Sequence, residues 1–298
     1  MSLVSKPVEL RQKVQSNIAK KARGEEITSA LLQHFERINS FDYFPVKEVE
    51  ELMIRQAQFE VSKMGKKHSY PQHLPRFSPS SSDKCERELF YKAMKSEKDP
   101  ADSVTFRRRW TRNSTAVHGC VQKQLLEAEV LLNEPAFKVH RLHNDLPAWE
   151  KNIEGWKLIT HNGVQFVLFG MCDGILEYQK DGSKVGFEYK TKSNSVAQIK
   201  SLREPSRSHF TQCVAYSILF GVDEWCITYE SVAKDKWTTG ENARPDMKIF
   251  YVKVTENDRQ RLLDRWSRVA MNLQDGEVSM PDFGKCLFCP FKNICSGV

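Results

Sequence analysis

The spacing of hydrophobic and polar positions changes twice along the chain. From residue 8 to about residue 65 the apolar residues recur at helical intervals, and a second helix begins after Pro45. Residues 71–82 are rich in Pro and Ser, which is typical of a linker or surface loop. This boundary predicts a helical N-terminal region over residues 1–70 and a larger domain over residues 71–298.

The middle of the chain switches to the pattern of strands. Residues 164–178 and 184–192 are rich in Val, Ile, Phe and Leu, and the QKDGS turn between them predicts a β-hairpin. This order of helices and strands predicts an α/β fold, with a central mixed β-sheet flanked by helices. Further elements are expected as strands over residues 224–232 and 248–254, and as helices over residues 114–132, 209–220 and 256–274.

Composition and charge exclude several classes of protein. With 40% hydrophobic residues among 298, the chain can bury a core, which excludes intrinsic disorder. The 45 Lys and Arg against 38 Asp and Glu give a net charge of +7, which permits an anionic partner without establishing one. No stretch approaches the roughly 20 apolar residues of a membrane span, and the polar N-terminus lacks a secretory signal. We expect a cytoplasmic protein without membrane contact.

The predicted hairpin carries an unusual group of charges. If its turn centres between Asp181 and Gly182, Asp173 on the first strand lies opposite Lys190 on the second. Glu188 and Lys190 are two residues apart, so they share a strand face. Two carboxylates and one ammonium group would then project to the same side, although a shift of one residue in register would separate them.

Two interpretations of this group are open from the hairpin alone. Nearby carboxylates repel each other unless a cation or a proton intervenes, and their oxygens suit Mg²⁺ or Mn²⁺. Lys190 could then orient a water or stabilise charge on a phosphate. The alternative is an ordinary salt bridge on a strand that faces solvent.

Other candidate residues lie on predicted helices. His118 could be a metal ligand or a packed histidine, and Gln212 and Tyr216, four residues apart, share a helix face but could be core-edge residues. Candidate phosphate contacts precede the His118 helix, although a solvated charge run is an equal alternative. They are Arg107, Arg108, Arg109 and Arg112.

Taken in order, these motifs resemble the RecB-type nucleases of the PD-(D/E)XK superfamily. The resemblance spans about Ser78 to Cys295 and consists of a helical His, a G-x-x-D, an E-x-K and a Q-x-x-x-Y motif. It implies a nuclease core over the larger domain. It also implies that the Gln and Tyr lie beside the substrate and that the Lys serves the attacking water. The implied catalytic residues are Asp173, Glu188 and Lys190, and the implied metal ligands are His118, Asp173, Glu188 and the backbone carbonyl of Tyr189.

The cysteines form a second pattern. Cys286, Cys289 and Cys295 make a C-x2-C-x5-C motif, and Cys85 lies far upstream. Four thiolates can hold Zn²⁺ or an iron–sulfur cluster, and spacing alone does not decide. The arrangement resembles the iron–sulfur branch of the family, which includes the AddB nuclease domain and the exonucleases of CRISPR adaptation. It implies a structural 4Fe–4S cluster that fixes the C-terminal end. The other cysteines, expected as small core residues, are Cys120, Cys172, Cys213 and Cys226.

The expected function is metal-dependent hydrolysis of DNA, as an exonuclease in recombination, repair or replication. No G-x-x-x-x-G-K-[ST] motif occurs, so the sequence predicts a free-standing nuclease rather than a fused helicase–nuclease. Such nucleases also occur in bacteriophages, in which case the host cytoplasm is the location. Two alternatives are a structure-specific endonuclease on the same core and a non-catalytic DNA-binding protein whose iron–sulfur cluster senses redox state.

The expected partner is DNA with a free end. Residues 1–65 could contact a recombinase or annealing protein, or could pack on the core, and we favour packing.

Overall fold

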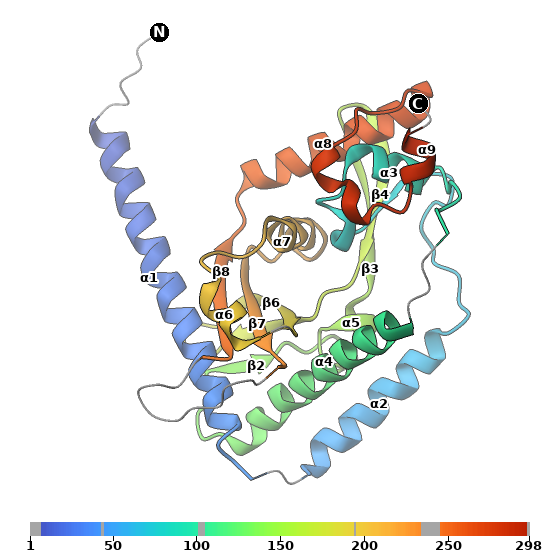
Figure 1. Cartoon of the computed structure of the whole chain (residues 1–298). Coiled ribbons are helices and arrows are strands. Elements are labelled where there is room, and N and C mark those ends of the chain that lie inside the picture. Colours follow the sequence, from blue (N-terminus) through green and yellow to red (C-terminus); the bar gives the residue numbers. More distant parts are fainter. Residues whose placement is uncertain (1–6, 43–44, 101–104, 194, 234–244, 297–298) are drawn as a thin grey trace.

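Helices surround the strands of the central part of the chain (Figure 1). The computed structural model describes residues 7–42, 45–100, 105–193, 195–233 and 245–296. The helices are α1 (Pro7–Ile38), α2 (Lys47–Lys63), α3 (Glu86–Ala93), α4 (Thr105–Leu131), α5 (Glu150–Ile153), α6 (Val196–Ser201), α7 (Arg207–Phe220), α8 (Glu256–Asp275) and α9 (Lys292–Ser296), with short 3-10 turns η1 (Pro79–Ser81) and η3 (Phe283–Phe288). The strands are β1 (Arg76–Phe77), β2 (Phe137–Val139), β3 (Gly155–His161), β4 (Val164–Gly170), β5 (Gly174–Tyr178), β6 (Ser183–Lys192), β7 (Glu224–Ser231) and β8 (Met247–Lys253).

The strands form two sheets. The larger has the order β2-β5-β6-β7-β8 and is mixed, because β6 and β7 run parallel while the other neighbours are antiparallel. The smaller has the order β1-β4-β3. The predicted α/β class with a mixed sheet and flanking helices is therefore confirmed. Residues 164–178, which read as one strand run, divide at residues 171–173 into β4 and β5 of different sheets. Strands β1, β2 and β3 were not predicted.

The predicted hairpin exists, but its register differs by two residues. Tyr178 pairs with Ser183 and Gly174 with Phe187, so the turn holds four residues. Gly182 occupies the left-handed region at φ 71°, and its N–H donates to the Tyr178 carbonyl at 2.8 Å. Continuing this register brings Asp173 beside Glu188 rather than opposite Lys190. A shift of two residues keeps every side chain on its predicted face, so the charged group survives the correction.

Each face of the larger sheet packs against its own set of helices. Trp225, Ile227 and Tyr229 on β7 point to the side of α7 and α8, whereas Cys226 between them points to the side of α1 and α4. This alternation follows from the two-residue period of a strand. Burying a large apolar side chain stabilises the fold by roughly 1.5–3 kcal/mol. The two apolar clusters therefore hold the sheet rigidly between helices.

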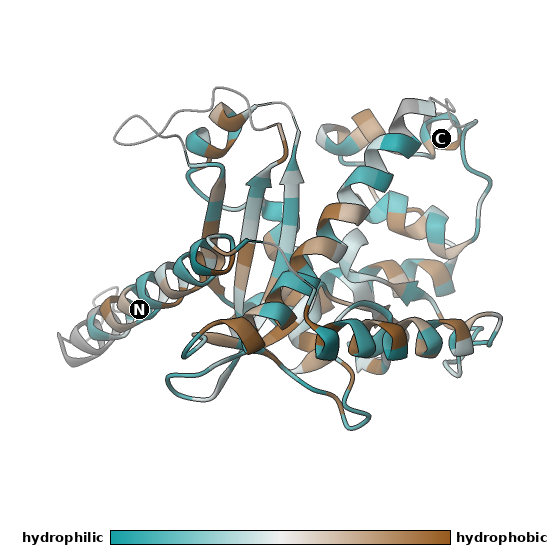
Figure 2. Cartoon of the chain, turned by 90° about the horizontal axis from the view of Figure 1, so that it is seen from below, coloured by the Kyte–Doolittle hydropathy of each residue, from teal (hydrophilic) through white to brown (hydrophobic). Residues whose placement is uncertain are grey.

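The C-terminal half of α1 belongs to this packing. Ile27, Leu31 and Phe35 are 0–2% exposed, which confirms the expected packing for this part of the N-terminal region. Ile18 is 64% exposed, and the N-terminal half of α1 extends away from the body of the molecule (Figure 1), whereas the hydrophobic positions of its other half face the rest of the protein (Figure 2). Among the described residues, none of the helices combines the length and the apolar composition that a membrane-spanning segment requires.

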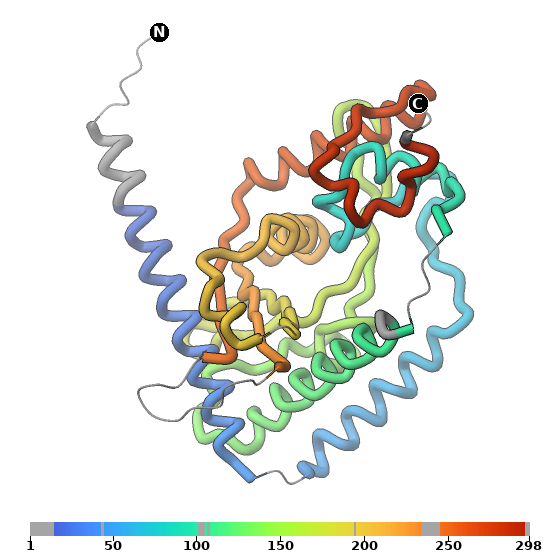
Figure 3. The backbone as a smooth tube through the Cα atoms, viewed as in Figure 1, coloured from blue at the N-terminus to red at the C-terminus, as the bar shows by residue number. Residues whose placement is uncertain are grey.

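The C-terminal segment folds back onto α3, so that two regions far apart in the sequence lie side by side (Figure 3). The rings of Tyr91 and Phe291 are 5.8 Å apart, and Phe291 is buried. The Asp99 N–H donates to the Pro290 carbonyl at 2.8 Å, and its carboxylate accepts from the Lys292 N–H at 2.7 Å. These contacts hold the C-terminal segment against α3, the helix that follows Cys85.

A buried histidine, His34, should make the stability of the fold depend on pH. His34 on α1 is 1% exposed and packs edge-on against Phe137 at 6.0 Å. Neither of its ring nitrogens has a hydrogen-bond partner among the described residues. Burial, with a smaller contribution from Arg37, lowers its pKa from 6.5 to about 4.

We expect wild type to lose more stability on acidification than His34→Leu does. Between pH 6.5 and pH 4 the unfolded chain binds a proton at this residue and the folded chain does not. Between pH 7.5 and pH 5 the free energy of unfolding of wild type should fall by about 2 kcal/mol more than that of His34→Leu, as measured by urea unfolding. The control His143→Leu changes an exposed histidine and should behave like wild type. Equal pH dependence of wild type and His34→Leu would contradict the prediction.

Candidate active site

Charged side chains from three segments of the chain meet where the two sheets separate. Asp173 occupies the break between β4 and β5, directly before β5 begins at Gly174. Glu188 and Lys190 lie on the neighbouring strand β6, and α4 brings His118 to the same place. Because β4 and β5 belong to different sheets, the break between them turns the backbone and leaves the Asp173 carboxylate accessible to the other three groups.

Asp173 is held by three contacts. Its Oδ2 accepts the Tyr189 N–H at 2.8 Å, and its Oδ1 lies 3.7 Å from His118 Nδ1. Its carbonyl accepts from Gln122 Nε2 at 2.9 Å. Gln122 is four residues after His118 on α4, so both residues lie on the same helix face. The helix thus contributes a side chain to the site and also fixes its central aspartate.

Glu188 and Lys190 form a buried ion pair. The side chain of Glu188 is completely buried, and its Oε1 contacts the Lys190 ammonium. No hydrogen bond reaches Glu188 Oε2 within the described part of the chain. Burial, reinforced by the nearby Asp173, raises the pKa of Glu188 to about 8. Burial alone would lower the pKa of Lys190, but Glu188 and Asp173 outweigh it and raise that pKa.

A third carboxylate, Glu150, completes the group and was missed by the sequence. One ligand atom each from His118, Glu150 and Asp173 lies within 4.8 Å of the others, which is the spacing of ligands around one metal ion. Burial, followed by repulsion from Asp173, raises the pKa of Glu150 to about 7. Its sequence context, at the start of a four-residue helix, carries no motif that indicates a ligand.

The backbone at Glu150 shows how it reaches the site. Its φ of 44° lies in the left-handed region, which non-glycine residues rarely occupy. The conformation is held by the Glu150 N–H, which donates to the Cys172 carbonyl at 2.8 Å. It is also held by the preceding Trp149, which is fully buried and donates its indole N–H to Gln56 at 2.8 Å. The fold therefore imposes a strained residue beside the site.

The donor set fits a divalent cation. Burial lowers the pKa of His118, which leaves a neutral imidazole that can coordinate a metal. Three carboxylates crowd together at a largely buried site, and burial raises the pKa of Asp173, Glu150 and Glu188 alike. A bound cation would relieve both the repulsion and the lost solvation. Carboxylates with one imidazole suit Mg²⁺ or Mn²⁺.

The predicted helix pair lies next to this group. Gln212 Nε2 donates to the Tyr216 hydroxyl at 2.7 Å, which confirms that the two share a face of α7. Tyr216 is 3% exposed and its ring stacks on Trp225 at 5.1 Å. Burial, together with Glu188 and Asp173, raises the pKa of its hydroxyl. Tyr216 is therefore a buried neighbour of the carboxylates, and Gln212 on the same helix face is more exposed.

The arginine run lies on the same helix as His118, not before it. Helix α4 begins at Thr105, so Arg108, Arg109 and Arg112 occupy its first turns, where their side chains are exposed. Arg107 lies outside the residues whose side chains are described. The hydroxyls of Ser114 and Thr191 are 3.0 Å apart, which fixes this part of α4 to the residue after Lys190.

The four predicted cluster cysteines gather in one corner of the molecule. Cys85 directly precedes α3, and its Sγ accepts the Asp282 N–H at 3.2 Å. Arg87 donates to the Sγ of Cys295 at 3.7 Å. Among the described residues, no three of these sulfurs lie within 4.8 Å of one another, whereas tetrahedral zinc would hold them about 3.8 Å apart.

The remaining cysteines divide into two groups. Cys172, Cys213 and Cys226 are 0–1% exposed, as predicted for core residues. The prediction was wrong for Cys120, which is exposed. It follows Gly119 on α4 and points away from the face that Val121 and Leu125 bury.

Comparison with known proteins places the chain in a family. The sequence model of the PD-(D/E)XK nuclease superfamily matches residues 87–296, and no curated protein matches the sequence. The fold is similar to the crystal structure of SSO0001, with 16% identity and a TM-score of 0.43 over 86% of this chain and 98% of that one. It is also similar to the alkaline exonuclease LHK-Exo from Laribacter hongkongensis, with 11% identity and a TM-score of 0.39 over 68% of this chain and 90% of that one. Because the family match covers more than half of the chain, this protein belongs to the PD-(D/E)XK nuclease superfamily.

Proposed function

We propose that the protein is a metal-dependent deoxyribonuclease that hydrolyses the phosphodiester bonds of DNA, acting as an exonuclease from a free end in recombination or repair. The observation that carries this proposal is the group of His118, Glu150 and Asp173 beside the buried pair of Glu188 and Lys190. A binding protein without catalysis would gain nothing from three carboxylates buried together, because their repulsion and desolvation destabilise the fold.

In this proposal the crowded carboxylates and the neighbouring histidine are the metal ligands. His118, Glu150, Asp173 and Glu188 hold one or two ions of Mg²⁺ or Mn²⁺, with the Tyr189 carbonyl as a further ligand. When bound, the metal supplies Lewis acidity for the scissile phosphate and for the attacking water. Support comes from Glu188 Oε2, a buried carboxylate oxygen that lacks a hydrogen-bond partner among the described residues.

Lys190 orients the attacking water and neutralises charge that develops on the phosphate. Its ammonium is anchored by Glu188, and both side chains belong to one strand, so the distance between ligand and cation is fixed by the backbone. The hydroxyl contact between Ser114 and Thr191 fixes α4 beside this end of β6, and the first turns of the same helix carry exposed arginines. Arg108, Arg109 and Arg112 then contact the DNA backbone, and Gln212 positions the substrate.

The cysteine corner supports a second proposal, a 4Fe–4S cluster held by Cys85, Cys286, Cys289 and Cys295. A four-iron cluster is larger than one zinc ion, so its thiolates stand farther apart than those of a zinc site. Donors to two of the sulfurs, the Asp282 N–H and the Arg87 guanidinium, suit thiolates that carry negative charge. The cluster would fix the C-terminal end to α3 and so complete a nuclease domain over residues 71–298, beside the helical region 1–70.

We expect wild type to shorten linear DNA progressively in Mn²⁺, to leave circular single-stranded DNA intact, and to stop in EDTA. Glu188→Gln and Lys190→Ala should each reduce the rate by several orders of magnitude, because one weakens metal binding and the other removes the positioned ammonium. End-labelled DNA on denaturing gels measures both effects. The control Lys184→Ala, at the exposed start of the same strand, should cleave like wild type. Internal cuts would indicate an endonuclease, and full activity in Glu188→Gln would refute the assigned site.

Glu150→Gln should weaken Mn²⁺ binding in isothermal titration calorimetry by about tenfold or more, because a carboxylate ligand is lost while the shape of the side chain is kept. His118→Ala should weaken it as well. Glu177→Gln changes a carboxylate of β5 that lies outside the group and should bind Mn²⁺ like wild type. Unchanged Mn²⁺ affinity in Glu150→Gln would show that this strained residue is not a ligand.

Protein purified without oxygen should be brown, with broad absorption at about 400 nm. Cys286→Ser should lose this colour and unfold at a lower temperature. The unfolding temperature falls because the cluster closes a long loop between Cys85 and the C-terminal segment. Cys120→Ser and Cys226→Ser should keep the colour. A colourless protein with one zinc per chain would exclude the iron–sulfur cluster and leave the nuclease proposal standing.

A further inference from the structure

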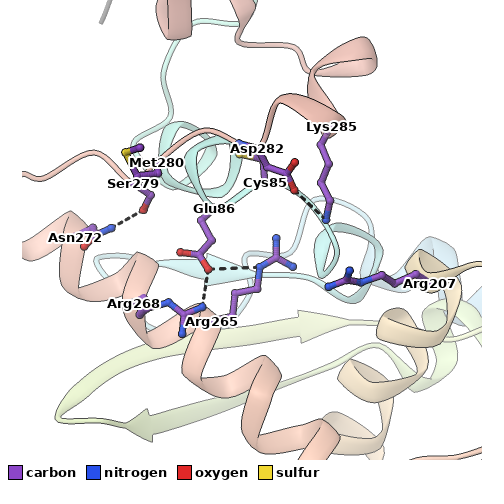
Figure 4. A pocket seen from close by; sticks show the side chains of 10 residues that line it. All are labelled: Cys85, Glu86, Arg207, Arg265, Arg268, Asn272, Ser279, Met280, Asp282 and Lys285. Atoms are coloured by element: carbon purple, nitrogen blue, oxygen red, sulfur yellow. Dashed lines mark hydrogen bonds and ion pairs between the residues drawn. The ribbon is translucent and has the colours of Figure 1, made fainter.

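A basic groove lies away from the carboxylate site, between α8, the start of α7 and the C-terminal segment. A cavity of about 570 Å³ is lined there by four cations, Arg207, Arg265, Arg268 and Lys285, and also by Glu86, Asp282 and Cys85 of the cysteine corner (Figure 4). A second cavity of about 270 Å³ shares Arg207 and Arg265 with the first and adds Arg261. The two cavities therefore adjoin each other, and together they are called the basic groove.

The cations in this groove outnumber the carboxylates that pair with them. Glu86 accepts two arginines, Arg268 at 2.7 Å and Arg265 at 3.8 Å, as Figure 4 shows. Asp83 likewise faces Lys285 at 3.0 Å and Arg207 at 3.6 Å. Asp282 also faces Lys285 at 4.0 Å, so the Asp83 group is balanced, whereas the Glu86 group has two arginines on one carboxylate and keeps a positive charge.

Helix α8 arranges its arginines as a stripe. Arg261, Arg265 and Arg268 are four and three residues apart, which is the spacing of one helix face. Arg261 is exposed and has no ion-pair partner within the described ranges. Arg265 is fixed by donating to the Ser82 carbonyl at 2.6 Å. Guanidinium groups in a row with one member fixed are suited to a chain of phosphates, because each fork can contact phosphate oxygens in a bidentate manner.

Exposed aromatic side chains lie on the C-terminal segment that forms one wall of this groove. Phe283 follows Asp282, which lines the cavity, and is 81% exposed; Phe288 at the end of η3 is 77% exposed. Large apolar side chains that stay in water have no part in the packing of the fold. A cationic groove flanked by exposed aromatic rings is the combination by which proteins bind single-stranded nucleic acid, since unpaired bases stack on the rings.

The groove and the carboxylate site lie on opposite faces of α7. Arg207, Thr211 and Val214 line the groove, whereas burial and the nearby Glu188 raise the pKa of Cys213 on the other face. A ligand in the groove therefore does not occupy the catalytic centre.

We propose that this groove binds single-stranded DNA, with the arginine stripe of α8 on the phosphates and Phe283 stacked on a base. The inference rests on the proposed function, because the strand bound is the unpaired strand of the nuclease's own DNA substrate. An acidic peptide would use the arginines but would leave the exposed rings without a role, so nucleic acid fits both features.

The test measures binding without cleavage. The full chain is titrated against a fluorescent oligothymidylate in EDTA, and anisotropy gives the affinity at several salt concentrations. Phe283→Ala should weaken binding about tenfold, and its affinity for blunt duplex DNA should be unchanged because paired bases cannot stack on the ring. Arg261→Gln with Arg268→Gln should reduce the slope of log affinity against log salt by about 1.4, which corresponds to two phosphate contacts on a single strand.

Matched controls lie on the other side of the molecule or on a loop. Arg55→Gln changes a half-exposed arginine of α2, and Phe41→Ala removes an aromatic ring that is 44% exposed. Both should bind oligothymidylate like wild type. The groove variants change exposed side chains, and unchanged unfolding temperatures would exclude a loss of fold.

The outcomes separate the groove from the proposed function. Groove variants that bind oligothymidylate like wild type, in a protein that cleaves DNA in Mn²⁺, would overturn the groove and leave the nuclease standing. Groove variants that lose affinity for poly-glutamate, an acidic peptide, but keep the wild-type affinity for oligothymidylate would overturn the proposal. They would indicate that the groove binds an acidic peptide. A wild-type protein that binds single-stranded DNA through the groove but never cleaves DNA would support the groove and refute the nuclease. A wild type that neither binds nor cleaves DNA would refute both.

Discussion

The burial of Glu188 is the constraint on which the rest of the site depends. A carboxylate removed completely from water is costly unless an opposite charge compensates it. The protein supplies Lys190 two residues away on the same strand, where the backbone fixes the pair. It then adds Asp173 and Glu150, which raise the cost again. Such an arrangement stabilises nothing by itself, and a divalent cation is the charge that would balance it.

The two sheets explain how these groups come together. The chain leaves β4 of one sheet and enters β5 of the other within residues 171–173, so Asp173 is presented at a bend rather than inside a ladder. Helix α4 spans this junction and contributes both His118 and Gln122. The strained backbone of Glu150 is held to the same bend through Cys172. Packing on both faces of the larger sheet makes this arrangement rigid, which catalysis by positioning requires.

The C-terminal segment contributes to both the cysteine corner and the basic groove. Its fold back onto α3 brings Cys286, Cys289 and Cys295 toward Cys85, and it also leaves Phe283 exposed next to Asp282, which lines the groove. If a cluster is held at this corner, the same segment serves two purposes. It fixes the end of the domain, and it supplies one wall of the groove that we propose binds single-stranded DNA. Both depend on contacts between residues that lie about 200 positions apart.

The sequence alone determined the fold class, the hairpin and the common face of Asp173, Glu188 and Lys190, because strand period and turn residues are local properties. It did not determine the register, since a turn of four residues and one centred on Asp181 and Gly182 fit the same letters. Only the tertiary structure decided that the apolar run divides between two sheets and that Glu150 joins the site. Glu150 reaches it through a left-handed backbone and a contact with Cys172, and neither leaves a periodic signal in the sequence.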